Sequence, residues 1–362
     1  MRPAHAIIDL AAIRHNYGIA KSTAPQARAI AIIKANGYGH GAVEVGKTLA
    51  SIADGFGVAC IEEALELRES GISNPMLLLE GIFDPDELPL VDKYRFSIAV
   101  ATHQQLDWLL ESKLKQPIDV FLKIDSGMHR LGFEPEEALE VYDKLKASAK
   151  VKNVVLMTHF ASADEPEKPT TDKQFARFTK AIKGIDAPCS LSNSAGTLAH
   201  PSTHQQFVRP GIMLYGATPL GHSSETDALL KPAMSLCSAI FSIRNLAAGE
   251  PIGYAGRYVC DRPTRVGVVA MGYADGYPRH AVDGTPVSID GHRSRIIGKV
   301  SMDMLTVDLT DLPHIKEGAS VELWGNEIKA NEVADHCGTI SYTLFTGVTR
   351  RVPLRHVNQI DI

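Results

Sequence analysis

The chain has 362 residues, of which 44% are hydrophobic and 22% charged, and its formal net charge is −5. This composition excludes a disordered or fibrous protein, and the lack of dense Lys/Arg runs gives no indication of binding to nucleic acid or to a membrane surface. The length favours one large domain followed by a smaller one, with a small soluble molecule as the expected partner.

Cysteines and the first residues bear on the cellular compartment. The five cysteines are scattered without any CxxC spacing, so the sequence indicates neither a disulfide framework nor a thiolate zinc site, and no metal is expected. Charged and polar residues throughout the first twenty positions leave no room for the apolar segment of a signal peptide. No uncharged apolar run approaches the length of a membrane span. We therefore expect a protein of the reducing cytoplasm.

Short apolar runs are the main feature of the first two thirds of the chain. Asp9 is predicted to cap a helix that continues to Ala24, and Pro25 closes it. From there, apolar runs alternate with segments of helical period. Eight such runs occur, at residues 29–33, 56–60, 76–79, 96–100, 118–124, 154–157, 189–191 and 207–208. Eight strand–helix units over about 200 residues are typical of a (β/α)8 TIM barrel.

The pattern changes near residues 222–232, where a polar patch is followed by Pro232. Beyond this point, strand-like runs predominate and only residues 331–337 have a helical pattern. The runs lie at 236–243, 265–271, 286–289, 295–309 and 320–324. The sequence therefore predicts a barrel over residues 1–227 and a predominantly β domain over residues 228–362.

Lys34 is the first candidate for chemistry. It follows five apolar residues directly and precedes a glycine-rich segment at 37–41. A lysine against apolar surface is costly unless it is paired or loses its charge in a covalent bond, so Lys34 is a candidate Schiff-base lysine. The alternative is a lysine that extends into solvent from the end of a strand, which is the commoner case for a lone lysine.

Functional residues of such barrels collect at the carboxyl ends of the strands. Polar and charged side chains follow four other runs: Lys123 and Arg130 after the fifth, His159 after the sixth, Asn193 and Ser194 after the seventh, and Arg209 after the eighth. The segments 194–196 and 211–212 have the residue types of a phosphate-binding cup, although two tight turns would look similar. An imine-forming lysine and a phosphate cup on one rim point to pyridoxal phosphate.

One literal motif, GxxxxGK[ST] at residues 41–48, would indicate a P-loop NTPase. A P-loop begins directly at the end of its strand, whereas Gly41 lies eight residues past Ile33. We therefore interpret Lys47 as a surface residue of a helix and keep the NTPase as an outside alternative.

Four long segments together carry a family resemblance. Residues 31–41, 123–132, 209–212 and 272–277 resemble the corresponding segments of bacterial alanine racemases, and the likeness extends from residue 5 to residue 357. The resemblance implies a homodimer that interconverts L-alanine and D-alanine with pyridoxal 5′-phosphate. The D-alanine would serve as a peptidoglycan precursor or be consumed in catabolism.

The resemblance also implies a role for each matching residue. Lys34 would bind the cofactor covalently and act as the base on one face of the substrate Cα, and Tyr254 of the second subunit would be the base on the other face. His159 would connect Tyr254 to Arg209, and Lys123, carbamylated in many relatives, would orient Arg130. The implied cofactor contacts are Lys34, Tyr38, Asn193, Ser194, Arg209, Gly211, Ile212 and Tyr342. The implied substrate contacts are Arg130 and, from the second subunit, Tyr273, Met302 and Asp303.

A two-base arrangement also has a physical reason. Racemisation removes a proton from one face of Cα and returns one to the other face, so bases on opposite sides are required. Tyrosine has an ordinary pKa of about 10 and needs cationic neighbours to act as a base. Arginine opposite the pyridine nitrogen keeps its proton, so the ring would be a weaker electron sink.

Two other functions remain open on the sequence alone. One is a pyridoxal-phosphate-dependent decarboxylase or aldolase of the same architecture, and the other is a non-catalytic pyridoxal-phosphate-binding protein, which would not need a tyrosine from a second subunit. Tyr273 and Met302 would restrict the space around the substrate side chain, which favours alanine, with serine as the alternative.

Overall fold

In the computed structural model, which describes residues 2–220 and 227–359, eight parallel strands close into a barrel because the last strand pairs with the first. The strands are β2 (Arg28–Ile32), β3 (Gly55–Val58), β4 (Met76–Leu78), β5 (Ser97–Val100), β6 (Ile118–Lys123), β7 (Val151–Met157), β8 (Cys189–Ser190) and β9 (Phe207–Val208). Each of the eight predicted runs coincides with one of them. The predicted (β/α)8 barrel is therefore confirmed.

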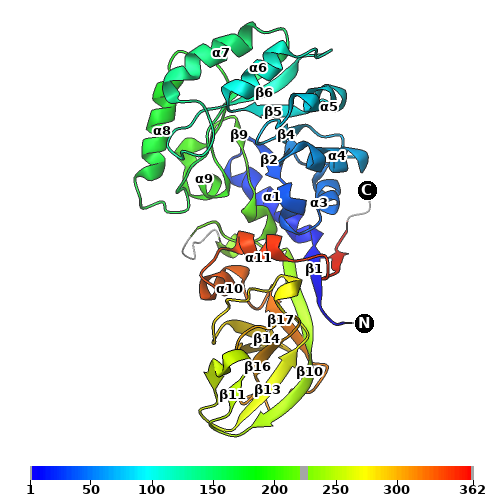
Figure 1. Ribbon diagram of the computed structural model, residues 1–362. Helices are drawn as coiled ribbons and strands as arrows, with labels where there is room; N and C mark the ends of the chain where they lie inside the picture. Colours follow the sequence, from blue (N-terminus) through cyan, green and yellow to red (C-terminus); the bar gives the residue numbers. More distant parts are fainter. Residues whose placement is uncertain (1, 221–226, 360–362) are drawn as a thin grey trace.

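Helices surround the barrel (Figure 1). They are α1 (Leu10–Thr23), α3 (Ala42–Leu49), α4 (Ile61–Glu69), α5 (Leu88–Tyr94), α6 (His103–Glu111), α7 (Ala138–Ala147), α8 (Thr170–Ala181) and α9 (Ser194–Ala199). The short segment α2 (Lys34–Tyr38) has left-handed backbone angles and is not a regular helix. The predicted cap of α1 is present, since the Asp9 carboxylate accepts a hydrogen bond from the amide of Ala12 at 3.1 Å. Within the described ranges, no helix has the length and apolar character that a membrane span requires.

The P-loop motif lies on helix α3 rather than on a loop that follows a strand. The helix begins at Ala42, and the Lys47 amine is paired with the Glu44 carboxylate of the same helix at 3.5 Å. Its side chain is half-exposed on the surface. The NTPase alternative is therefore wrong.

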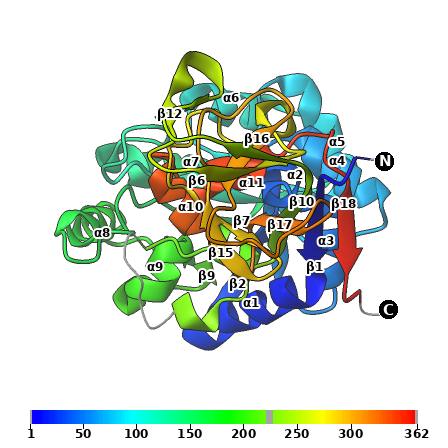
Figure 2. The ribbon, with the colours of Figure 1, turned by 90° about the horizontal axis from the view of Figure 1, so that it is seen from below.

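The C-terminal domain is mostly β and lies against one end of the barrel (Figures 1 and 2). Its strands are β10 (Met234–Leu246), β11 (Pro251–Ile252), β12 (Tyr258–Val259), β13 (Thr264–Val269), β14 (Pro286–Ile289), β15 (His292–Arg295), β16 (Leu305–Asp308), β17 (Ser320–Trp324) and β18 (Leu354–Val357). β10 is the central strand, because it pairs with β13 along one half and with β17 and the N-terminal strand along the other. The predicted run 295–309 is not one strand, since residues between β15 and β16 form an irregular loop.

The N-terminal strand β1 (His5–Asp9) belongs to the sheet of the second domain. It pairs antiparallel with β10 and parallel with β18. The barrel is already closed by eight other strands, so β1 has no place in it and buries its apolar residues Ala6 and Ile8 in the β sheet instead. The domain boundary was placed at the polar patch 222–227, of which residues 222–226 lie outside the described residues.

Two helices occupy the junction between barrel and sheet in Figure 1: α10 (Ala330–His336) and α11 (Ser341–Gly347). The first was predicted. The second was not, because its aromatic and β-branched residues favour strands. Burial of Leu344 and Phe345 against the barrel overrides that preference, and the ring of Phe345 packs edge-on to His40 at 5.0 Å.

Candidate active site

A cavity of about 760 Å³ opens at the carboxyl ends of the barrel strands. Eleven of the predicted site residues line it: Lys34, Tyr38, Lys123, Arg130, His159, Asn193, Ser194, Arg209, Gly211, Ile212 and Tyr342. They come from six segments that are far apart in the sequence. The structure thus brings together the residues that the strand-end rule and the family resemblance selected on the barrel side.

Lys34 stands at the junction between β2 and an unusual backbone turn. Ala35, Asn36, Gly37 and Tyr38 all have positive φ angles, from 51° to 61°, so this segment is a left-handed turn. Such a conformation is disfavoured by about 1–2 kcal/mol for each residue that carries a Cβ. The turn points the Lys34 side chain into the cavity, where its amine lies 3.9 Å from the carboxylate of Glu80.

A group of small and hydroxyl side chains forms the floor beside this turn. The Ser194 hydroxyl accepts hydrogen bonds from the amides of Gly211 at 2.8 Å and Met213 at 3.4 Å. A Cβ at Gly211 would lie 2.8 Å from the Tyr38 hydroxyl oxygen, so only glycine leaves this space free. Burial raises the pKa of Tyr38 to about 12, which keeps its hydroxyl protonated as a donor at neutral pH.

Tyr342 completes this floor from α11, with its ring centroid 5.9 Å from that of Tyr38. Burial raises the pKa of its phenol as well. Asn193 also lines the cavity, and its side-chain oxygen accepts from the amide of Gly196 at 2.9 Å and caps α9. Hydroxyls and backbone amides on a glycine-lined floor are donors that suit a phosphate.

Arg209 is buried on the opposite wall. Its guanidinium donates to the carbonyl of Ser190 at 2.7 Å and to the carbonyl of Thr158 at 2.7 Å, and burial lowers its pKa to about 10. It still carries its full charge at neutral pH. The same guanidinium lies 3.4 Å from Nδ1 of His159. Because arginine can only donate, this nitrogen accepts, and His159 holds its own proton on Nε2.

Three cationic side chains, Arg209, Lys123 and Arg130, line the same cavity. Burial, followed by the charges of Arg209 and Lys123, lowers the pKa of His159 well below its usual value, so this ring is neutral. Burial and the charges of Arg209 and Arg130 also lower the pKa of Lys123 to about 8. An appreciable fraction of Lys123 is a free amine near neutral pH, the form that reacts with carbon dioxide. An anionic ligand would relieve the repulsion among these groups.

Arg130 is presented by a loop that Asp125 shapes. One oxygen of this buried carboxylate accepts from three successive backbone amides, those of Gly127, Met128 and His129, at 2.8–3.1 Å. These bonds lower the pKa of Asp125 despite its burial. Arg130 itself is exposed at the mouth of the cavity, where it is accessible to a carboxylate.

Four of the five predicted site residues of the β domain lie elsewhere. Tyr254, Tyr273, Met302 and Asp303 are not among the residues that line the cavity. Tyr254 is 67% exposed and Met302 52% exposed. Backbone bonds hold Tyr273 and Met302 in one loop cluster, since the Ala274 amide donates to the Met302 carbonyl at 3.0 Å. A single chain does not bring these side chains to Lys34.

The cavity also contains residues that the sequence analysis missed. Glu80 follows the third apolar run and Thr102 follows the fourth, so the same strand-end rule applied to every strand would have found both. Phe83 and Trp108 also line the cavity, and no sequence signal marked them.

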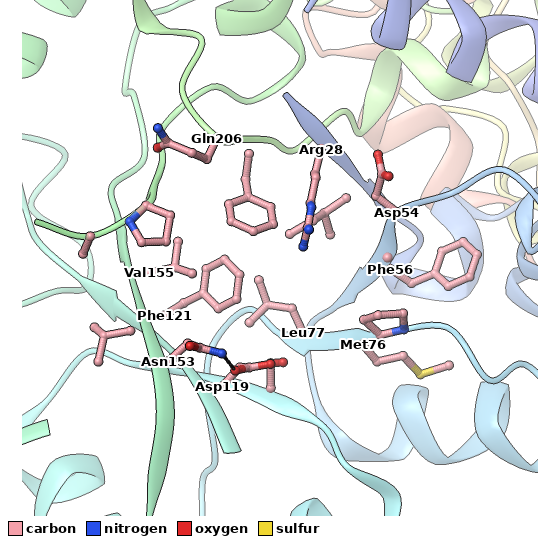
Figure 3. Close-up of a pocket in the computed structure, with 18 of the residues that line it drawn as sticks. Arg28, Asp54, Phe56, Met76, Leu77, Asp119, Phe121, Asn153, Val155 and Gln206 are labelled. Carbon is pink, nitrogen blue, oxygen red and sulfur yellow. Dashed lines mark hydrogen bonds between the residues drawn. The ribbon is translucent and has the colours of Figure 1, made fainter. Parts of the chain in front are cut away.

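A second cavity, of about 540 Å³, opens at the other end of the barrel (Figure 3). It is lined by residues from the amino ends of the strands, among them Arg28, Leu77, Phe121, Val155 and Phe207. Two of its carboxylates have partners: Asp54 pairs with Lys21 at 2.8 Å, and Asp119 accepts from Asn153 at 2.7 Å.

Comparisons with known proteins agree with the arrangement of both domains. Residues 8–219 match the alanine racemase N-terminal domain and residues 233–356 match the alanine racemase C-terminal domain. The catabolic alanine racemase of Pseudomonas putida is 51% identical, over 99% of this chain and 100% of its own. The crystal structure of the biosynthetic alanine racemase from Pseudomonas aeruginosa superimposes with a TM-score of 0.97 at 47% identity, covering 99% of this chain and 100% of that chain. The alanine racemase from Acinetobacter baumannii superimposes with a TM-score of 0.94 at 36% identity, covering 99% and 100%. The chain belongs to the alanine racemase family.

Proposed function

We propose that the protein interconverts L-alanine and D-alanine with pyridoxal 5′-phosphate bound at the carboxyl end of the barrel. The observation that carries this proposal is the position of Lys34, whose amine enters a cavity with a hydroxyl-lined floor on one side and the wall of Arg209, Lys123 and Arg130 on the other. The full-length likeness to alanine racemases, and the names of those relatives, support the choice of substrate.

The residues present fit this cofactor. Gly211 leaves the space beside the Tyr38 hydroxyl free, and Ser194, Tyr342 and the backbone around Ile212 offer the donors that a phosphate requires. Lys34 would hold the aldehyde carbon, and Arg209 would face the ring nitrogen with a group that keeps its proton. When bound, the cofactor withdraws electrons from the substrate Cα and makes its proton acidic.

The residues of the chain then supply orientation and proton transfer. Arg130 holds the substrate carboxylate at the mouth of the cavity, with Lys123 behind it. Lys34 removes or returns the proton on one face of Cα. Neutral His159, which is hydrogen-bonded to Arg209, exchanges a proton with the base on the other face of the substrate Cα.

The base for that other face is proposed to come from a second copy of the chain. Tyr254 is the candidate, because it is largely exposed in the single chain and lies in the domain that contributes nothing but α11 to the cavity. Tyr273, Met302 and Asp303 of the same copy would border the entrance and limit the size of the substrate side chain. The active unit is therefore a homodimer with shared sites.

Incubation of the loaded protein with L-alanine in deuterated water tests the reaction. We expect deuterium at Cα and decay of optical rotation to zero, since equal amounts of the enantiomers form. Release of carbon dioxide would identify a decarboxylase instead, and binding without exchange would identify a non-catalytic protein.

A further inference from the structure

We propose that Glu63 is a positioning residue for Lys34. Its carboxylate ties the left-handed turn that carries Lys34 to the first turn of α4, and so determines where the Lys34 amine stands in the cavity. The inference rests on the proposed function, because it assigns Glu63 to the half of the reaction that Lys34 performs.

The carboxylate of Glu63 bridges two separate segments of the chain. One oxygen accepts from the amide of Ala35 at 2.7 Å and the other accepts from the amide of Ala59 at 2.8 Å. Ala35 is the residue directly after Lys34, and Ala59 directly follows β3. Glu63 itself is half-buried on α4 and does not line the cavity. It therefore acts on Lys34 only through the backbone.

The bond to Ala35 replaces one that the left-handed turn cannot make for itself. Inside the turn, the Gly37 amide donates to the Ile33 carbonyl at 2.9 Å and the Gly39 amide donates to the Ala35 carbonyl at 3.0 Å. The Ala35 amide stands at the start of this pattern and has its acceptor on Glu63. Since alanine and tyrosine do not favour positive φ, the turn needs such external bonds to persist.

Helix capping accounts for only half of this arrangement. A glutamate at the third position of a helix commonly bonds back to the amide that precedes the helix, and the bond to Ala59 is of this kind. The bond to Ala35 crosses to a different strand–turn unit and adds nothing to the cap. Because a carboxylate has two acceptors and no donor, glutamate can serve both amides, whereas glutamine would turn an N–H toward one of them.

Lys34 depends on this backbone bond because its side chain is weakly held. Its amine has the Glu80 carboxylate at 3.9 Å, and both side chains are more than a third exposed. A shift of about 1 Å in a reacting group can cost about 100-fold in rate. We therefore expect Glu63→Gln to lower kcat by roughly 10- to 100-fold with little change in KM for alanine.

Glu137→Gln is the matched control. Glu137 also engages both oxygens, with the His103 ring at 2.8 Å and the Glu134 amide at 3.1 Å, but it makes no bond to the turn at Lys34. Hydrogen–deuterium exchange without cofactor provides the first readout. The amide of Ala35 should exchange faster in Glu63→Gln and at the wild-type rate in Glu137→Gln. Protection of Ala35 in Glu63→Gln would overturn the inference.

The second readout separates positioning from a general structural effect. Primary deuterium isotope effects on kcat/KM are measured with each enantiomer labelled at Cα. The enantiomer that Lys34 deprotonates is identified as the one that still exchanges its Cα proton, without inversion, in Tyr254→Phe. In Glu63→Gln the isotope effect should rise for that enantiomer and fall for the other, whereas uniform loss of folded enzyme would move neither.

The outcomes distinguish the inference from the proposed function. If the wild-type holoenzyme does not racemise alanine, the proposed function fails. The exchange rate of the Ala35 amide still reports on its hydrogen bond to Glu63 in that case. If the wild type racemises and the two isotope effects in Glu63→Gln stay at their wild-type values, the inference fails alone. Glu63→Asp, which keeps the charge but is too short to bridge both amides, should reproduce the asymmetry if Glu63→Gln proves poorly folded.

Discussion

The two ends of the barrel have cavities of comparable size but differ in how their charged side chains are arranged. At the carboxyl end, Lys123, Arg209 and Arg130 face one another, and the pKa of Lys123 falls to about 8 as a result of burial and this repulsion. At the amino end, the carboxylates of Asp54 and Asp119 each have a partner within 3 Å. Buried cations that repel one another, rather than the volume of the cavity, therefore distinguish the carboxyl end of this barrel.

The backbone shows the same contrast. The carboxyl end holds a left-handed turn with three residues that carry a Cβ in a disfavoured conformation, while the amino end is built from ordinary strands and apolar contacts such as Phe121 against Phe207 at 5.8 Å. The carboxyl end thus maintains a costly backbone conformation, whereas the strands at the amino end have ordinary geometry. Substitutions should thus affect activity at one end and stability at the other.

The largest effect is expected for Lys34→Ala. If Lys34 is both the attachment point of the cofactor and one of the two bases, its loss should lower kcat/KM for alanine by about 10⁴-fold or more, since proton transfer by a positioned base alone contributes about 10²–10⁴-fold. Racemisation is followed by polarimetry. Lys47→Ala on the surface of α3 serves as the control and should retain wild-type kcat/KM. Appreciable turnover by Lys34→Ala would contradict the assignment of the active site to the carboxyl end of the barrel.

A mixing experiment tests whether the carboxyl end is completed by another chain. Lys34→Ala and Tyr254→Phe are each expected to be nearly inactive. When they are unfolded and refolded together in equal amounts, half of the dimers are mixed and each mixed dimer holds one intact site of two, so about a quarter of the wild-type activity should return. Refolding each variant alone is the control. If the mixture stays inactive, Tyr254 acts within its own chain or not at all.

At the amino end, Phe121→Ala should affect stability and spare chemistry. The Phe121 ring is 4% exposed, and truncation of a buried phenylalanine to alanine typically costs about 3–5 kcal/mol in free energy of unfolding. Urea unfolding measures this loss, and kcat of the folded fraction should remain at the wild-type value. A large fall in kcat without loss of stability would contradict the division of roles between the two ends.

The smallest effect concerns the pH dependence of stability through Lys123. Its pKa is about 8 in the folded protein against an ordinary 10.5, so the unfolded chain binds more protons between these values. The free energy of unfolding of the cofactor-free protein should therefore rise as pH increases from 8 to 10.5, by at most about 3 kcal/mol from this group. Lys123→Met should flatten this rise and increase stability below pH 8. Identical pH profiles would mean that the pKa of Lys123 is the same in the folded protein and in the unfolded chain.

The sequence predicted the features that depend on local pattern. All eight barrel strands followed from apolar runs, and Lys34, Lys123, His159 and Arg209 followed from the rule that functional groups lie at strand ends. Helix α11 was not predicted, because the burial of Phe345 and Leu344 overrides the local preference of this segment for a strand. The left-handed turn was not predicted either. Only the glycines of residues 37–41 indicate positive φ angles, and three residues of the turn are not glycine.

Contacts between distant segments were beyond the reach of sequence patterns. Nothing local in Glu63 or Glu80 shows that one bonds to the turn at Lys34 and the other faces its amine. For the same reason β1 was assigned with the barrel, although its partners are β10 and β18. Roles for Tyr254, Tyr273, Met302 and Asp303 came from the family resemblance, and they stay predictions until the dimer is tested.

The pairing of β1 with β18 has a consequence for how the chain is made. The ribosome synthesises β1 first and β18 last, with the whole barrel between them, and their pairing joins residues as far apart as Ala6 and Leu354. The barrel strands can associate with near neighbours as they emerge, but the β sheet is complete only when its last strand, β18, has been made. Until then one edge of β1 has no partner, so the nascent chain carries an open strand edge that can pair with other chains until β18 emerges.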